Sequence, residues 1–296
     1  MKKFLYMAAF VILCCGASLS SCNDDKLGGV SIFKTDAPKK RDALEQWLYL
    51  NYTMPYNVDF MYKLVKGQTD FTYNYVPADL AKTAKLAIIT KFIWFDPYTE
   101  VAGLDFLKEN VPRIIVAVGN PGYTRYRTEV VGSAEGGYKV TLSKVNALTE
   151  DLLKDYRSMN GFYFHTMHHE FMHILNQKQP YDKSFEEISR PDYVSGNWTT
   201  IPEKRTYQLG FVSPYSMDNP DEDIAELYSI YVTSTPQEWN NIISNAGNNG
   251  ANTINRKVDF VRKYMKDSWG VDIELLRNAI LRRGSRISKL NLNSLK

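Results

Sequence analysis

The chain has 296 residues, of which 44% are hydrophobic and 23% charged, a mixture typical of a globular protein with one large domain or two small lobes. The formal net charge is +3, and the acid-free segment 1–22 holds two of these charges, so the remainder carries +1. A near-neutral chain excludes an electrostatic case for nucleic-acid binding.

The N-terminus has the build of a secretory signal peptide. A basic pair precedes an apolar run, residues 4–15, which is too short to span a bilayer comfortably. Residues 19–22 (LSSC) resemble the bacterial lipobox, in which the cysteine becomes the lipid-modified first residue. A plain secretory signal with an incidental cysteine is the alternative. We predict a lipoprotein signal peptide over 1–22 and a lipid anchor at Cys22.

The positions of the three cysteines agree with a lipid anchor at Cys22. Cys14 and Cys15 lie in the signal segment and Cys22 is the predicted lipid site, so no thiol is left for disulfides or metal binding. Residues 23–36 predict a polar tether. The acidic residues just after Cys22 resemble the surface-export signal of Bacteroidetes lipoproteins, which favours outward display on the outer membrane over a periplasmic position.

Helices and strands alternate in the next part of the chain. Apolar residues at helical spacing predict a helix over 42–51, and apolar-polar alternation predicts a strand over 58–64. A second helix is expected over 79–95, with Asp96 and Pro97 as its stop.

Short strands should follow. The β-branched run 113–118 predicts a central strand, and 123–132 another strand or hairpin arm. Residues 133–137 are expected as a turn, and 138–142 as a strand whose polar side chains face out. This order suits an α+β fold with a small twisted mixed sheet whose last strand borders the next helix.

From residue 179 onward the pattern is helical. The connection 180–215 is long enough to predict a structured, functional loop. Asn219 is the expected cap of a helix, and three further helices should follow, interrupted by a mobile Asn- and Gly-rich loop at 245–252. We predict an N-terminal lobe that ends near residue 178 and a mainly helical C-terminal lobe over 179–296.

All four histidines lie in residues 165–173 (HTMHHEFMH), which contain H-E-x-x-H once. Positions i and i+4 share one face of a helix, so His169 and His173 can bind one zinc ion while Glu170 activates a water molecule. A chance pattern on an amphipathic helix is the alternative. However, the apolar flanks predict a buried helix, and burying imidazoles and a carboxylate without partners would be costly. We expect one Zn²⁺ per chain.

A hydrolytic zinc centre needs a third protein ligand. No histidine follows His173 and no cysteine remains, and Gln179 stands where a metzincin would have its third histidine. The third ligand must therefore be Asp, Glu or water, and a carboxylate on another element is expected.

Glu222 and Glu226 are the preferred candidates, four residues apart on one predicted helical face. One can bind the metal while the other hydrogen-bonds a ligand histidine. We prefer Glu222 as ligand and Glu226 as the supporting acid, with Glu186 and Glu187 less favoured. Alternatively, Glu222 only completes a helix cap with Asn219.

Three other residues have weaker signals. Tyr215 precedes Glu222 by seven residues, and a phenol beside zinc can stabilise the oxyanion of a tetrahedral intermediate, although it is one of twenty tyrosines. His165 can face the same cleft, whereas His168 points to another face. For both histidines a structural or rim role is preferred.

These motifs resemble a known family, the zinc-binding metallopeptidases of Bacteroidetes lipoproteins, also called substrate import-associated zinc metallohydrolase lipoproteins. The resemblance covers most of the mature chain. It is carried by Cys22, residues 47–62, 134–137, 169–177 and 222–226. The order of Tyr215, Glu222 and Glu226 also resembles the catalytic domain of anthrax lethal factor.

The resemblance implies a single zincin-like, gluzincin-type catalytic domain over 37–296. It also implies a zinc metallopeptidase at the outer membrane, associated with nutrient import and with a TonB-dependent channel and its surface binding lipoprotein. Its substrate would be a peptide or protein. The alternatives are a non-catalytic binding lipoprotein with a structural or vestigial metal site, and hydrolysis of a non-peptide bond.

Overall fold

The computed structural model describes residues 40–64, 67, 73–123, 129–130, 132–135 and 138–295. The predicted signal peptide, the tether and Cys22 lie outside these residues. Residues from Asp42 onward form one unit, which holds all the elements below. Across the described residues, no helix is both long enough and apolar enough to cross a membrane.

The first predicted helix is confirmed, and its helical path extends to Tyr56. α2 (Ala43–Leu48) continues through a wide turn, η2 (Tyr49–Thr53), into α3 (Met54–Tyr56). A capping box starts it: the backbone N–H of Glu45 donates to the Asp42 side chain, and the N–H of Asp42 donates to the Glu45 side chain.

The second predicted helix begins at its expected cap, Asp79, but the predicted stop at Asp96 and Pro97 is wrong. The helical path continues to Gly103, which has a φ of 89°. Pro97 is tolerated because it falls in the first turn of a new segment, where its missing N–H is not needed. The segments are α4 (Leu80–Thr90), η3 (Lys91–Phe95), α5 (Asp96–Ala102) and then α6 (Leu104–Asn110).

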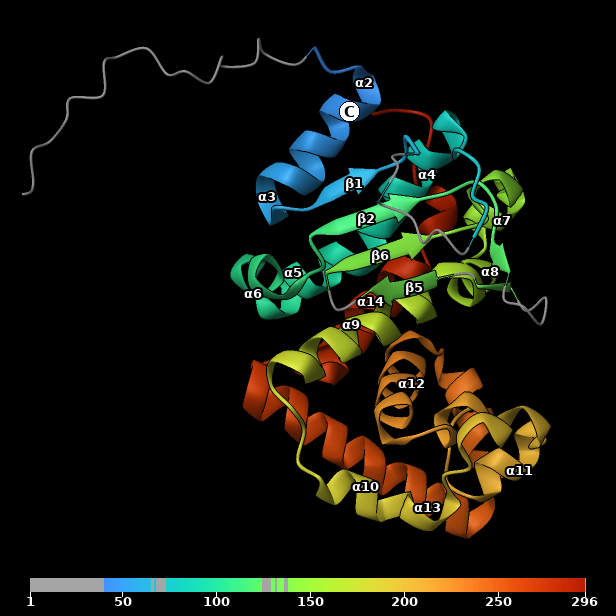
Figure 1. Ribbon diagram of the computed structural model, residues 1–296. Helices are drawn as coiled ribbons and strands as arrows, with labels where there is room; N and C mark the ends of the chain where they lie inside the picture. Colours follow the sequence, from blue (N-terminus) through green and yellow to red (C-terminus); the bar gives the residue numbers. More distant parts are fainter. Residues whose placement is uncertain are drawn as a thin grey trace, which may run out of the picture. The chain divides into compact units, whose positions relative to one another are not determined.

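A four-stranded mixed sheet has the order β1-β2-β6-β5 (Figure 1). β1, β2 and β6 are parallel, and β5 is antiparallel to β6. Ile115 and Val140 in the inner strands are fully buried, because inner strands are covered on both faces. The central strand predicted over 113–118 is thus confirmed. The strands are β1 (Asp59–Met61), β2 (Ile114–Ala117), β5 (Gly132–Glu135) and β6 (Lys139–Leu142).

Some predicted details of the sheet are wrong. The turn expected at 133–137 overlaps strand β5, and the strand that borders the histidine helix is β5 rather than β6 (Figure 1). Because β6 lies between β2 and β5, its polar residues Lys139 and Thr141 are buried instead of facing out. The predicted hairpin arm is present as β3 (Gly122–Tyr123) paired with β4 (Glu129–Val130).

Short helices then lead into the histidine helix, α9 (His165–Lys178), and out of it again. The expectation that 180–215 is structured is confirmed, since most of this connection is helical. The short helices before α9 are η4 (Val145–Ala147), α7 (Glu150–Lys154), α8 (Tyr156–Met159) and η5 (Asn160–Phe164). Those after it are α10 (Ser184–Ser189), η6 (Arg190–Asp192), η7 (Ser195–Thr200), α11 (Glu203–Gln208) and η8 (Tyr215–Met217).

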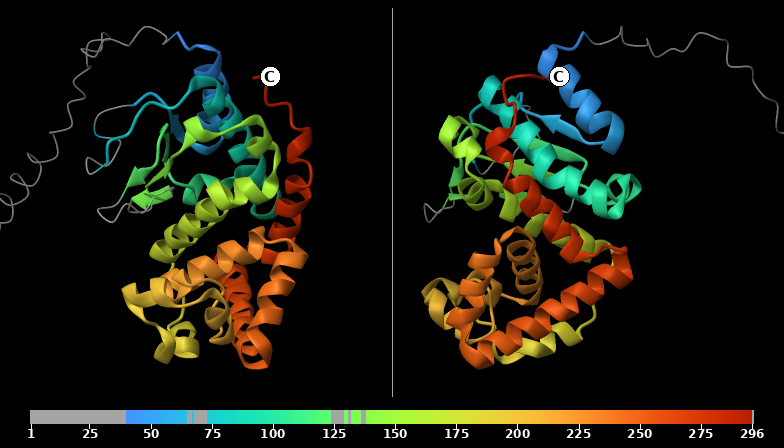
Figure 2. Two further views of the ribbon diagram at one scale, coloured as in Figure 1. Left: turned by 90° about the vertical axis from the view of Figure 1, so that its right-hand side faces the viewer. Right: turned by 180° about the vertical axis from the view of Figure 1, so that it is seen from behind.

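Longer helices complete the chain. The predicted break between two helices within 245–252 is found, but it is a kink rather than a loop: α13 joins two helical segments at Gly247, where φ is 64° and ψ is −175°. α14 returns to pack against α5 and η3 (Figure 2). The fold is mixed α+β and mostly helical, while the predicted lobe boundary near residue 178 stays a prediction. These last elements are α12 (Pro220–Thr233), α13 (Pro236–Trp269), α14 (Ile273–Gly284) and η9 (Ile287–Lys289).

Candidate metal centre

Two helices from distant parts of the sequence meet at the site. α9 and α12 pack against each other (Figure 1). Buried apolar residues, among them Phe171 and Leu175, hold one side of α9 in the core. Another side presents three histidines one turn apart toward the carboxylates of α12: His165, His169 and His173.

Donor atoms of the three predicted ligands converge. Glu222 Oε2 lies 3.0 Å from His169 Nε2 and 3.3 Å from His173 Nε2, and these two nitrogens are 3.0 Å apart. A tetrahedral zinc ion with bonds of about 2.0–2.1 Å keeps its ligand atoms about 3.3 Å apart. The donor set therefore fits zinc in both spacing and chemistry, with three protein ligands as in hydrolytic sites.

Mutual hydrogen bonds shift the pKa values of these groups in opposite directions. Burial disfavours charged His169, but hydrogen bonds to Glu222 and Glu226 outweigh this and raise its pKa to about 10. Burial disfavours ionised Glu222, but hydrogen bonds to His169 and His173 lower its pKa to about 2. Glu222 is therefore ionised at neutral pH, as a carboxylate ligand must be.

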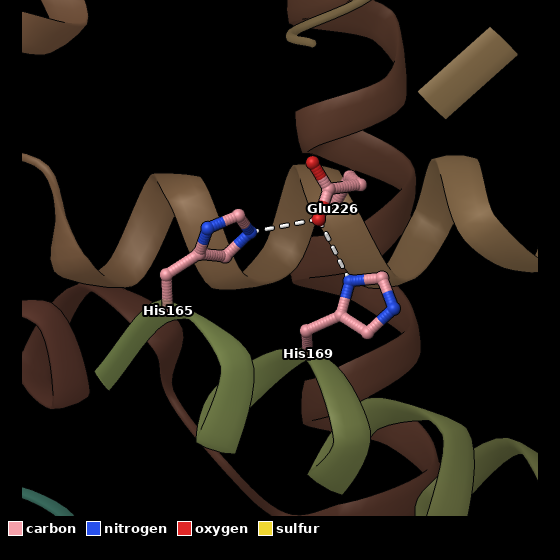
Figure 3. A group of neighbouring side chains, drawn as sticks. All are labelled: His165, His169 and Glu226. Carbon is pink, nitrogen blue, oxygen red and sulfur yellow. Dashed lines mark hydrogen bonds and ion pairs between the residues drawn. The ribbon is translucent and has the colours of Figure 1, made fainter. Parts of the chain in front are cut away.

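Glu226 lies on the other side of His169 and is 4% exposed (Figure 3). Its Oε1 is 2.8 Å from His169 Nδ1 and 2.7 Å from His165 Nε2. Burial opposes ionisation of Glu226, yet the two histidines hold its pKa well below the usual range. An ionised acceptor at Nδ1 favours the tautomer that leaves the Nε2 lone pair of His169 for a metal. Glu226 thus lies where the supporting acid was expected.

Tyr215 lies against the same histidine. Its ring stacks on His169 with centroids 5.9 Å apart and planes 22° from parallel, and Trp198 contacts it edge-on at 5.1 Å. Burial raises the pKa of Tyr215 above its ordinary value, and Glu222 raises it further by its charge and by a hydrogen bond. The phenol therefore stays protonated at neutral pH and can donate a hydrogen bond.

A cavity of about 280 Å³ opens beside the donor set. Glu170, the predicted base, lines this cavity together with His173 and Glu222. The negative charge of Glu170 also contributes to the raised pKa values of His169 and Tyr215. A substrate in this cavity would contact the base and the candidate metal ligands at once.

The other sequence candidates have different surroundings. Glu222 does not complete a helix cap: Asn219 accepts the N–H groups of Asp221 and Glu222, while the Glu222 carboxylate faces the histidines. Glu187 of α10 pairs with Arg190, the first residue of η6. Among the described residues, neither Glu186 nor Glu187 joins a group that could hold a metal.

His168 is fully buried, as its predicted structural role requires. Its Nδ1 lies 3.0 Å from the Tyr98 hydroxyl, which lies 2.8 Å from that of Tyr228. Burial, helped by the charge of His165, lowers the pKa of His168 to about 3, so this imidazole is neutral. The three side chains connect α5, α9 and α12.

Sequence reasoning did not single out three neighbours of the site. Trp198 contacts Tyr215, and Ser213 donates a hydrogen bond of 2.5 Å to Glu226 Oε2. Lys257 of α13 forms a fully buried ion pair of 2.7 Å with Asp223, next to Glu222. No local signal marks these residues, because each acquires its role from a partner distant in the sequence or across a turn.

Fold and site define a class: a mixed α+β protein in which two helices bring histidines and glutamates into groups suited to a metal ion. A family model described as "Putative zinc-binding metallo-peptidase" matches residues 37–274, and the chain belongs to that family, which confirms the predicted membership. A crystal structure of a protein with the same description, from Bacteroides caccae, is 40% identical. The match covers 90% of this chain and 100% of that one, with a TM-score of 0.77. No curated protein matches the chain.

Replacing Glu222 and Glu226 of α12 one at a time should separate the role of the metal ligand from that of the supporting acid. Glu222→Ala removes a predicted ligand and should abolish stoichiometric zinc binding. Glu226→Ala removes only the acceptor for His169 and should weaken zinc binding about 10–100-fold. Equilibrium dialysis with metal analysis measures both, and circular dichroism of the metal-free variants controls for folding. Loss of zinc in Glu226→Ala alone would reverse the assignment.

Zinc uptake should release a proton. Because the pKa of His169 in the metal-free protein is raised to about 10, this imidazole is protonated at pH 8 and must lose its proton to bind a metal. Calorimetric titration in buffers of different ionisation enthalpy should give a release of about one to two protons per zinc at pH 8, one from His169 and the remainder from zinc-bound water. A release near zero would show that His169 is already neutral.

Proposed function

We propose that the chain is a zinc-dependent metallopeptidase of the gluzincin type. The observation that carries the proposal is the convergence of His169 Nε2, His173 Nε2 and Glu222 Oε2 within 3.0–3.3 Å of one another. Glu170 lines the adjoining cavity. A third ligand from a second helix, rather than from the extended motif of α9, supports the gluzincin assignment.

Zinc bound to these three residues would supply Lewis acidity, which lowers the pKa of a water molecule and polarises a carbonyl group. In the proposed reaction the Glu170 carboxylate accepts the proton of the attacking water and then passes it to the leaving amine. Its position on the cavity wall, beside both the candidate ligands and the space for a substrate, supports this role.

Tyr215 is the proposed oxyanion donor. Its raised pKa keeps the hydroxyl protonated, and the stack on His169 holds the ring beside the donor set. The negative charge of a tetrahedral intermediate arises only after attack, so a hydrogen bond from this phenol would stabilise the transition state more than the substrate.

Strand β5 is suited to align a peptide. It pairs with β6 on one side and borders α9, whereas β6 is enclosed between β2 and β5. Among the described strands of this sheet, β5 has no partner on its outer edge. We propose that an extended substrate adds to β5 by backbone hydrogen bonds, a mode of binding that would favour a peptide over a compact molecule.

Substitution of the proposed base tests this function. Glu170→Gln keeps the side-chain shape but cannot accept a proton, so cleavage of a peptide library should fall about 10²–10⁴-fold while one zinc per chain is retained. Unchanged cleavage in the variant would refute the mechanism. A wild-type protein that binds one zinc and cleaves no peptide would favour the binding-lipoprotein alternative.

We also propose that the protein is anchored by lipid at Cys22 to the outer membrane, faces outward, and acts in nutrient import beside a TonB-dependent channel and its binding lipoprotein. The lipobox-like residues 19–22 and the acids after them support this proposal.

Labelling of cells with radioactive palmitate tests the anchor. The wild type should incorporate label and sediment with outer membranes, whereas Cys22→Ser should do neither, because a serine cannot take the thioether-linked lipid. Label that persists in Cys22→Ser would place the modification elsewhere. For the wild type, protease accessibility on intact cells distinguishes outward from periplasmic display.

A further inference from the structure

Three histidines of α9 and two glutamates of α12 form one cluster, which extends one helical turn beyond the candidate metal ligands. Its side chains follow one another in the order His165, Glu226, His169, Glu222 and His173. His165 and His169 both point at the carboxylate of Glu226 (Figure 3). His165 does not belong to the donor group formed by His169, His173 and Glu222. Its imidazole therefore has a task that the proposed catalytic cycle does not explain.

Glu226 is held by three hydrogen bonds. Oε1 accepts from His165 at 2.7 Å and from His169 at 2.8 Å, and Oε2 accepts from the Ser213 hydroxyl at 2.5 Å. The side chain is 4% exposed, so little water can replace any of these donors. A buried carboxylate needs such partners, and donors on both oxygens also fix the rotation of the carboxylate plane.

Ser213 is itself held in place. Its hydroxyl accepts the backbone N–H of Ser216 at 3.1 Å, and the Ser216 hydroxyl donates to the Ser213 carbonyl at 2.7 Å. Tyr215 lies within this turn, between the two serines. The bond from Ser213 to Glu226 therefore ties the turn that carries the proposed oxyanion donor to the acid that orients His169.

We propose that His165 and Ser213 are positioning residues, which lock Glu226 and through it set the zinc affinity of the site. The inference rests on the proposed function, since it requires His169 to be a zinc ligand. With Glu226 immobile, the Nδ1–H of His169 has one acceptor in one direction, and Nε2, once it loses its proton on zinc binding, directs its lone pair toward Glu222 and His173. If the donor from His165 or the donor from Ser213 is removed, the Glu226 carboxylate can rotate and no longer fixes the orientation of His169.

The test is the zinc dissociation constant of the full chain, measured by competition with a chromophoric chelator. His165→Phe and Ser213→Ala remove the donors and should each weaken zinc binding about 10-fold, the lower end of the effect expected for groups that orient a ligand. His165→Gln and Ser213→Thr are the matched controls. Each keeps a donor and should stay within about threefold of the wild type.

A double-mutant cycle distinguishes positioning from general destabilisation. Because His165 acts through Glu226, His165→Phe should cause no further loss of affinity in a Glu226→Ala background. Full additivity would overturn the proposal, as would unchanged affinity in both His165→Phe and Ser213→Ala. Thermal unfolding of the metal-free variants shows whether each is folded, and the Ser213 pair gives an independent answer if His165→Phe is not.

Three further outcomes separate this inference from the proposed function. If the wild type binds no zinc, the proposed function fails, and this inference with it. If the wild type binds one zinc that His173→Ala abolishes, but His165→Phe has no effect, the proposed function stands and the positioning role of His165 is refuted. Loss of zinc in His165→Phe as complete as in His173→Ala would make His165 a ligand and overturn the proposal.

Discussion

The pairing of imidazoles on α9 with carboxylates on α12 is the interaction on which the candidate site depends. His169 is 7% and Glu226 4% exposed, and neither side chain could stay at such depth alone, because an unpaired buried charge costs several kcal/mol. Together they satisfy each other at 2.8 Å. The same contacts that make burial tolerable also aim the donor atoms, so the stability of this region and the geometry of the site have one physical origin.

Such short contacts require α9 and α12 to keep a constant register. Two buried polar groups outside the donor set provide it. Tyr98, between His168 and Tyr228, connects α9 to α12 through α5. Lys257 pairs with Asp223, the neighbour of Glu222, and thereby attaches the start of α12 to α13. Both groups are fully buried, and breaking either contact would leave a buried polar group without that partner, so each favours a single relative placement of the helices.

Much of the local structure could be predicted because its signals are local. The capping residues Asp79 and Asn219 each act within three residues, and the two helices begin where they were predicted to begin. The wrong predictions also arise because these signals are local. Proline at position 97 resembles a helix stop, but it falls in the first turn of α5, where proline is tolerated. The Asn- and Gly-rich run resembles a loop, but only Gly247 in it leaves the helical conformation. The prediction of a turn at 133–137 is wrong because the residues of β5, GSAE, have little β-propensity, and pairing with β6 is what makes them a strand.

The sequence by itself determined the histidine motif, and the absence of later histidines or cysteines restricted the third ligand to a carboxylate or water, since metal chemistry allows few donor types. It also determined which two acids share a helical face, because that follows from the helical period. Only the tertiary structure decided that Glu222 meets His169 and His173 while Glu226 takes the opposite nitrogen of His169, and that His165 and Ser213 converge on Glu226. Those contacts depend on the rotation and register of α9 against α12, which are set by packing among residues far apart in the chain.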